Sequence, residues 1–175
     1  MLIVQGNADS RACIRLSGAD VGLGGEITEP VDDGPGNIGV RSNIKGFACE
    51  YMTSGRVVIL GDPGPYAFAG MTGGVVYQML TPEMGLDIDA LKLRLARGAQ
   101  VEIKPLEAPD VPEIQILLGH YIDALHETHQ SEVSAHILSL CAEWTLVNRF
   151  VKIVPKVVYK APVVMATEAS AVPTP

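Results

Sequence analysis

The sequence has few aromatic residues and little positive charge. Aromatic residues make up 5% of its 175 positions, and 13 Lys and Arg residues stand against 20 Asp and Glu residues, so that the formal net charge is -7. Affinity for nucleic acid depends largely on Lys and Arg displacing counterions from phosphates. The composition therefore argues against a nucleic-acid partner.

Long apolar runs and a charged leader are also lacking. The apolar stretches are far shorter than the roughly 18 residues that a membrane-spanning helix needs. The opening segment Met1-Leu2-Ile3-Val4-Gln5-Gly6 has neither the basic residues nor the long apolar core of a signal peptide. We therefore expect no membrane association and a cytoplasmic location.

Cysteine is scarce, with Cys13, Cys49 and Cys141 widely separated in the chain. Three residues without Cys-x-x-Cys spacing make neither a disulfide framework nor a metal-binding pair. Free cysteine behaves as a small apolar residue, so buried free thiols are expected. A reactive Cys49 stays open, although the carboxylate of the adjacent Glu50 would disfavour its thiolate.

The most informative feature present is a short repeat. Met-Thr-x-Gly followed by a Val-rich run occurs at 52–58 and again at 71–76, with Met52 and Met71, and Val57 and Val76, each 19 positions apart. A fixed short period is typical of stacked coils, in which equivalent residues lie above one another. It predicts a mainly β fold, a right-handed parallel β-helix of a few coils. The alternative is an antiparallel strand pair joined by the Asp62-Pro63-Gly64-Pro65 turn.

The same residues carry a family resemblance. Residues 46–77, with Gly22-Leu23-Gly24-Gly25-Glu26-Ile27 upstream, resemble the glycine-motif (GXGXG) β-helix domain at the C-terminus of the glutamate synthase large subunit. The most specific phrases are CEYMTSGRVVILG and FAGMTGGVVY, and VEIKPL, Glu143-Trp144 and RFVKIVP follow in the family's order. The likeness covers most of residues 17–155. Ser54 departs from it where a second glycine is usual, and the short link 30–37 replaces about two expected coils.

The resemblance implies a spacer rather than a catalyst. In that family the domain lies between a glutamine amidotransferase domain and a flavin domain with FMN and an iron-sulfur cluster. It implies a non-catalytic structural subunit of a glutamate-synthase-like oxidoreductase complex for glutamate biosynthesis, with flavin synthase-type and amidotransferase-type subunits as partners. FMN and the iron-sulfur cluster are then expected in the partner, and none in this chain. A β-helix subunit of a formylmethanofuran-dehydrogenase-like enzyme and a stand-alone interaction module are the alternatives. Homo-oligomer formation, substrate, electron donor and stoichiometry stay open.

The second half of the chain predicts a strand and a helical hairpin. Residues 87–97 fit either a helix or a strand, and 101–106 read as a short strand. One apolar stripe predicts a helix after an N-cap at Asp110, and a second helix is expected after Ser131; the inward residues are Ile114, Leu117, Leu118, Tyr121, Ile122 and Leu125, then Val133, Ile137, Leu140, Cys141 and Trp144. The domain prediction is thus a repeat region at 1–80, a strand with a hairpin packing on or capping the coil at 81–160, and a disordered tail at 161–175.

No residue is predicted to have a catalytic, cofactor-binding or metal-binding role. His126 and His129 are three positions apart, without the His-Glu-x-x-His spacing of a zinc helix. The Gly22-x-Gly24-Gly25 cluster lacks the Lys and Ser or Thr of a phosphate loop. Asp32-Asp33 and Glu50 are interpreted as isolated, solvated turn carboxylates.

Overall fold

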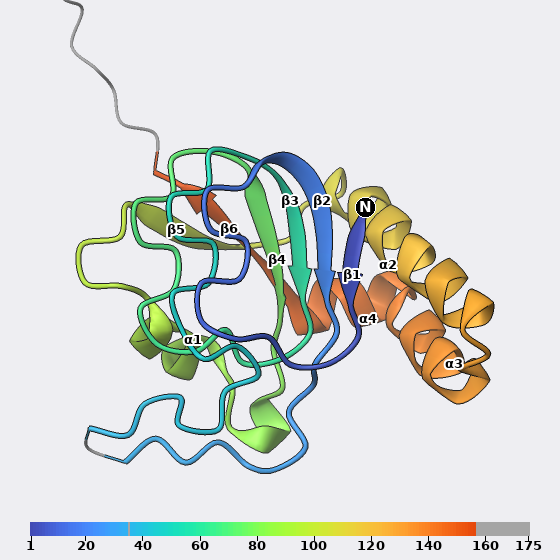
Figure 1. Cartoon of the computed structure of the whole chain (residues 1–175), viewed down its shortest axis with the longest axis horizontal. Coiled ribbons are helices and arrows are strands. Elements are labelled where there is room, and N and C mark those ends of the chain that lie inside the picture. Colours follow the sequence, from blue (N-terminus) through green and yellow to red (C-terminus); the bar gives the residue numbers. More distant parts are fainter. Residues whose placement is uncertain (35, 157–175) are drawn as a thin grey trace, which may run out of the picture.

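The computed structural model describes residues 1–34 and 36–156 (Figure 1). The tail predicted at 161–175 lies outside the described residues. Six strands form one sheet in the order β1-β2-β3-β4-β6-β5. The strands are β1 (Leu2–Val4), β2 (Ser17–Leu23), β3 (Ser54–Ile59), β4 (Val75–Met79), β5 (Val101–Pro105) and β6 (Phe150–Pro155). The helices are the short 3-10 helix η1 (Pro82–Met84) and α1 (Ile88–Arg94), α2 (Asp110–Glu127), α3 (Ser131–Leu140) and α4 (Glu143–Arg149).

The 19-residue period sets the register between two neighbouring strands. β3 and β4 are parallel, and Val57 lies opposite Val76. The prediction that these valines are stacked is confirmed, and the antiparallel alternative is wrong. β1 and β2 extend the parallel part of the sheet on the other side of β3.

Between the parallel strands the chain returns through three stacked turns, at residues 8–16, 46–52 and 65–71. Their backbones repeatedly enter the left-handed region at residues other than glycine: Arg11, Cys13, Arg15, Phe47, Cys49, Tyr51, Tyr66 and Phe68. That conformation costs about 1 kcal/mol or more for each such residue. Hydrogen bonds between turns offset the cost, among them Cys49 N–H to Ala12 O at 2.9 Å and Phe68 N–H to Ala48 O at 2.7 Å.

The predicted fold class, a mainly β right-handed parallel β-helix, is wrong. Only β1 to β4 run parallel, and the sheet continues with antiparallel pairings of β4 with β6 and of β6 with β5. Four α-helices are present in the described chain, and α2 alone has 18 residues. The chain is a mixed α/β fold. The prediction failed because the 19-residue period occurs only at residues 52–76 and carries no information about the rest of the chain.

Apolar residues fill two cores, one on each face of the sheet. Val57, Ile59 and Val76 face the stacked turns, where Met52 and Phe68 complete the first core. The alternate residues of the same strands belong to the second core together with α2, α3 and α4, which lie on one side of the sheet in Figure 1. The central strands are thus buried on both faces, as is typical of parallel sheets under helices.

The helical hairpin is confirmed, with corrections in detail. α2 and α3 meet around residues 128–130, and α2 starts at Asp110 itself, with Pro109 in the cap position, so the predicted N-cap is wrong by one residue. The second helix is broken at Cys141 and Ala142 into α3 and α4. Trp144, predicted to face inward, is 75% exposed, so this prediction is wrong. The segment 87–97, which fits either a helix or a strand in the sequence, contains α1, whose N-terminus is capped by the Asp87 carboxylate accepting from Ala90 N–H.

Within residues 1–34 and 36–156, no helix combines the length and apolar character needed to cross a membrane. The cytoplasmic location stays a prediction.

Candidate functional site

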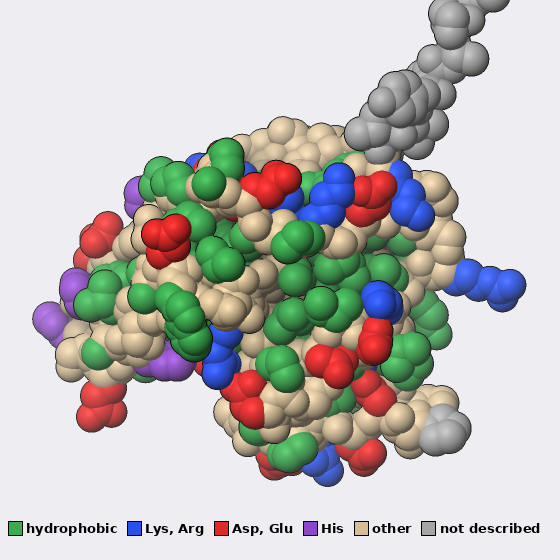
Figure 2. Space-filling model, turned by 180° about the vertical axis from the view of Figure 1, so that it is seen from behind, with side chains coloured by type: hydrophobic (Ala, Val, Ile, Leu, Met, Phe, Trp, Pro, Cys, Tyr) green, Lys and Arg blue, Asp and Glu red, His purple; other side chains and the backbone are tan. Residues whose placement is uncertain are grey.

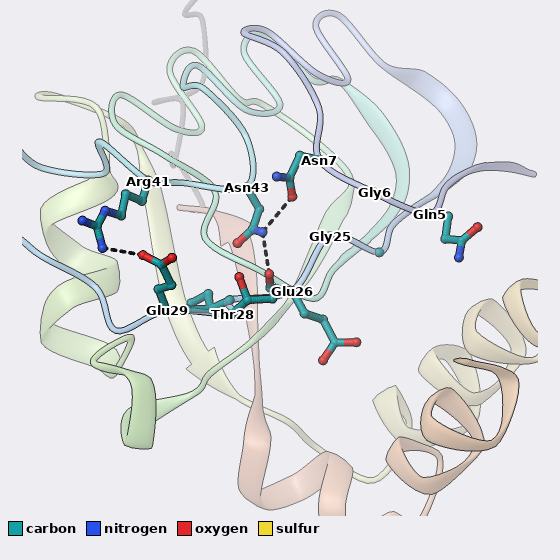
Figure 3. Close-up of a pocket in the computed structure, with 11 residues that line it drawn as sticks. Gln5, Gly6, Asn7, Gly25, Glu26, Thr28, Glu29, Arg41 and Asn43 are labelled. Carbon is teal, nitrogen blue, oxygen red and sulfur yellow. Dashed lines mark hydrogen bonds and ion pairs between the residues drawn. The ribbon is translucent and has the colours of Figure 1, made fainter. Parts of the chain in front are cut away.

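A polar cleft lies beyond the carboxyl ends of β1 and β2 (Figure 3). Its volume is about 630 Å³, and its walls are formed by Gln5 to Asn7, Gly24 to Glu29, and Arg41 with Asn43. The carboxyl ends of parallel strands are where ligands bind most often in open α/β sheets. We therefore take this cleft as the candidate site.

Asn43 organises the cleft. Its side-chain Nδ2 donates to Asn7 Oδ1 at 2.8 Å and to Glu26 O at 2.7 Å, and its Oδ1 accepts from Asp62 N–H at 2.8 Å. Asn43 is 7% exposed, so these bonds are largely shielded from water. One amide thus ties together the segments that follow β1, β2 and β3, as Figure 3 shows for the first two.

Gly24 and Gly25 in the cleft, and Gly61 after β3, allow neighbouring segments to approach closely. A Cβ on Gly25 would lie 2.5 Å from Asn7 Oδ1 and 2.8 Å from Gly6 O, and a Cβ on Gly61 would lie 2.2 Å from Gly25 O. On Gly24 it would lie 2.2 Å from Tyr121 Oη on α2. We call each parallel strand together with the stacked turn that leads to the next strand a winding. The Gly22-x-Gly24-Gly25 cluster therefore allows neighbouring windings to pack against one another and against α2.

Asp62, whose backbone N–H is bonded to Asn43, is one of two carboxylates that Arg94 joins. Arg94 is fully buried on α1 and donates to Asp62 from Nε at 3.0 Å and from Nη2 at 2.7 Å. Nη2 also donates to Asp33 Oδ1 at 3.0 Å. Burial alone would raise the pKa of Asp33, but the hydrogen bonds from Arg94 and from Gly39 N–H outweigh it and the pKa is lowered.

The interpretation of Asp33 and Glu50 as isolated, solvated carboxylates is wrong. Asp33 is not an isolated turn residue, because it is an ion-pair partner of Arg94. Glu50 is only 12% exposed at its side chain, with its Oε2 at 3.6 Å from Arg11 Nε, so a solvated interpretation is wrong there too. Asp32 is exposed, as expected.

Glu29 and Glu26, two residues that line the cleft, make polar contacts with other side chains. Arg41 Nη1 lies 2.6 Å from Glu29 Oε2, with both side chains mostly exposed. Glu26 Oε2 lies 2.9 Å from His136 Nε2 and thereby connects the cleft to α3. The mixed charge favours a polar ligand or a polypeptide segment over a polyanion.

Amides, carboxylates and one hydroxyl line the cleft. The groups that could bind a ligand or carry a proton are the carboxylates of Glu26 and Glu29 and the Thr28 hydroxyl, beside the amides of Gln5, Asn7 and Asn43. His126, one of the two histidines considered for zinc, instead shares a 2.7 Å hydrogen bond with Ser134 Oγ. Within residues 1–34 and 36–156, no three His, Cys, Asp or Glu side chains are placed to hold a metal ion.

Sequence reasoning missed Asn43, Asp62 and Arg94. In the sequence Asp62 is interpreted as part of the 62–65 turn, and Asn43 gives no signal. Arg94 offered one, because a helix with Leu91 inward also places residue 94, three positions on, toward the core. A buried Arg requires a partner, which would have pointed to a carboxylate.

Comparisons with a family model and with known proteins point to the same family. The family model described as "GXGXG motif" matches residues 1–156. The chain is 34% identical over 155 residues to the glutamate synthase [NADPH] large chain of Bacillus subtilis (strain 168), covering 87% of this chain and 8% of that protein. It is 35% identical over 127 residues to glutamate synthase [NADH] of Schizosaccharomyces pombe, covering 72% and 5%. The chain thus spans less than a tenth of the length of these relatives.

Proposed function

Since the chain belongs to the GXGXG motif family and is related to glutamate synthases, we propose that it is a non-catalytic structural subunit of a glutamate-synthase-type oxidoreductase complex. It holds an amidotransferase-type subunit and an FMN-binding subunit in register, and so limits how far ammonia travels between their sites. The observation that carries this proposal is the 34% identity over 155 residues to one segment of a glutamate synthase large chain.

The stiffness of the fold supports a positional role. The stacked turns on one face and the parallel strands on the other are hydrogen-bonded from winding to winding. Arg94 and Asn43 add buried polar contacts between windings. Such a structure keeps two attached proteins at a fixed separation.

Two exposed apolar surfaces are available for partners. Tyr66 and Leu93, 56% and 55% exposed, border a hollow of about 410 Å³ beside α1. Trp144 and Val147 are 75% and 50% exposed on α4, which lies with the helices on the other side of the sheet (Figure 1). Figure 2 shows apolar side chains gathered over the middle of the face seen from behind, with charged groups beside them. Tyr, Trp and Arg are enriched where interfaces gain most of their affinity.

The redox groups belong to the partner in this proposal. An iron-sulfur cluster is usually held by four Cys thiolates, and the chain has three cysteines. These three also divide between the two cores, since Cys13 and Cys49 pack in one and Cys141 in the other. The residues present therefore do not fit a cluster, and no electron-transfer step is assigned to them.

Native purification tests the proposal. We expect a tagged chain at its natural level to recover a flavoprotein with an iron-sulfur cluster and an amidotransferase-type protein. Recovery of the chain alone would favour the stand-alone interaction module, and recovery with another oxidoreductase lacking an amidotransferase would favour the formylmethanofuran-dehydrogenase-like alternative. The isolated chain should be colourless and inactive with glutamine, 2-oxoglutarate and a reductant. Turnover by it alone would contradict a structural role.

Paired variants locate the two contacts. Y66A/L93A should lose one partner and W144A/V147A the other, because each pair removes the exposed apolar side chains of one surface. The matched control is Asp123→Ala, an exposed residue of α2. All variants should keep the circular dichroism of the wild type. Unchanged recovery of both partners with both double variants would remove these surfaces from the proposal.

A further inference from the structure

Cys13 and Cys49 face each other from neighbouring stacked turns. Arg11 N–H donates to Gly46 O at 2.9 Å, and Cys49 N–H donates to Ala12 O at 2.9 Å. This alternation is that of a parallel ladder in which each residue opposes the one 36 positions later. The register therefore places position 13 opposite position 49.

The two cysteines also share a backbone conformation. Their φ angles are 61° and 54°, so their side chains leave the ladder in the same direction. Both pack in the core between the sheet and the stacked turns. The adjacent pair shows that opposed side chains meet, because Arg11 Cζ lies 5.7 Å from the ring centroid of Phe47. A ladder spacing of about 4.8 Å falls within the Cα separations of disulfides, about 4.4 to 6.8 Å.

The thiols differ in access and acidity. Cys49 is fully buried, whereas Cys13 is partly exposed. A hydrogen bond from Cys49 lowers the pKa of the Cys13 thiol, and the same bond together with burial raises the pKa of Cys49. Cys13 is thus the more nucleophilic and the more accessible sulfur.

From this geometry we infer that Cys13 and Cys49 are an oxidative modification site, at which hydrogen peroxide closes a disulfide between two windings. The Cys13 thiolate attacks one peroxide oxygen, the O–O bond breaks, and the departing hydroxide takes a proton to become water. Cys13 is then a sulfenic acid. The Cys49 sulfur attacks the Cys13 sulfur, the S–O bond breaks, and the hydroxyl leaves as a second water with the Cys49 proton. Two thiols are oxidised by two electrons and one peroxide is reduced to two waters.

The consequence is a covalent tie between the turn after β1 and the turn before β3. It constrains the unfolded chain across the whole intervening segment, so the oxidised protein should melt at a higher temperature than the reduced one. A dithiol reductant should reverse the shift by thiol–disulfide exchange. The site is independent of the proposed structural role, because it needs no partner protein.

The test uses the full wild-type chain, reduced, freed of reductant and titrated with hydrogen peroxide. We expect the free thiols, counted after the treated protein is denatured, to fall from three to one, the intact mass to fall by two hydrogens, and peptide mapping to recover a Cys13–Cys49 linked peptide. Three remaining thiols, or products that involve Cys141, would overturn the inference. Circular dichroism before and after oxidation verifies that the chain stays folded.

Serine variants separate the two sulfurs. C49S should stop at the sulfenic acid of Cys13, which dimedone traps, and C13S should leave Cys49 unmodified because it is buried. C141S is the matched control and should lose the same two hydrogens as the wild type. Labelling of Cys49 by dimedone in C13S would contradict the assigned order. Peptide mapping of the wild type decides the inference even where a serine variant folds poorly.

Discussion

Arg94 and Asp62 form a buried ion pair, with Arg94 Nη2 at 2.7 Å from Asp62 Oδ2 and Nε at 3.0 Å from Oδ1. The Arg94 side chain is fully buried, and that of Asp62 is 5% exposed. Asp33 contacts the same guanidinium from the segment that follows β2. A single charge therefore connects α1, the end of β3 and the long connection between β2 and β3.

Arg94→Ala should cost about 3 to 5 kcal/mol of unfolding free energy, because it leaves two carboxylates with no cation in a poorly solvated site. Urea unfolding followed by circular dichroism measures the loss. Arg97→Ala is the matched control, since Arg97 lies just beyond the C-terminal end of α1 and is exposed. This substitution should change the free energy of unfolding by less than about 0.5 kcal/mol. Equal effects of the two substitutions would contradict the role given to the buried pair.

Asp33 should make stability depend on pH in acid. Its folded pKa is lowered, whereas an unfolded Asp has a pKa of about 3.9. The ionised form therefore stabilises the fold at neutral pH, and this contribution is lost as pH falls through about 4 toward the folded pKa. Wild type should exceed Asp33→Asn in stability at pH 7, and the gap should narrow by pH 3. Urea unfolding at several pH values measures the gap, and Asp32→Asn, at the exposed neighbouring residue, is the matched control variant.

The repeat predicted the parallel pairing of β3 with β4, because a fixed offset between like residues dictates register. It could not predict the sheet beyond β4. β6 pairs with β4 although about 70 residues separate them in sequence, and such pairing depends on which edge the chain finally covers. The left-handed turns gave no signal either, since Arg11 and Phe47 are not residues that normally adopt positive φ.

The candidate site could not be predicted from the sequence for a related reason. Its polar contacts join distant segments, as when Asn43 bonds to Asn7 over 36 positions and Arg94 to Asp33 over 61. Local patterns report which face of an element is apolar and do not report which polar groups meet. The Gly24-Gly25 pair was visible, but its reason, the approach of Tyr121 and Gly6, exists only in the folded chain.

Gly73→Ala should destabilise the protein by several kcal/mol, because a Cβ there would lie 1.9 Å from the backbone oxygen Thr53 O of the preceding winding. The two strands would have to separate or the turn deform. Gly119→Ala in α2 is the control, for which we expect the opposite effect on stability. Nothing lies within 4 Å of its Cβ, and helix propensity predicts a gain of about 1 kcal/mol. Thermal melts of both variants measure the contrast, and a loss at both sites or at neither would count against the stacked windings.

Asn43→Ala should cost about 2 to 3 kcal/mol, since it removes three hydrogen bonds and leaves Asp62 N–H without its acceptor in a buried site. Hydrogen exchange should increase first at the Asp62 amide. Asn148→Ala provides the comparison, because Asn148 is exposed and, within residues 1–34 and 36–156, its side chain bonds to Trp144 O on its own helix. If the Asp62 amide kept its protection in Asn43→Ala, the assigned role of the side chain would be wrong.

Trp144 should report directly on partner binding. A continuous second helix would have placed it inward, but Ala142 is extended, with φ -62° and ψ 131°, so α4 restarts in a different phase and the indole faces water. It is the only tryptophan in the sequence. Emission from the isolated chain should therefore lie near that of free tryptophan and be quenched readily by acrylamide, and Trp144→Ala should change stability by less than about 0.5 kcal/mol. Addition of a partner that covers α4 should shift the emission to the blue. Blue-shifted, protected emission from the chain alone would mean that the indole is already packed and that α4 presents no apolar surface.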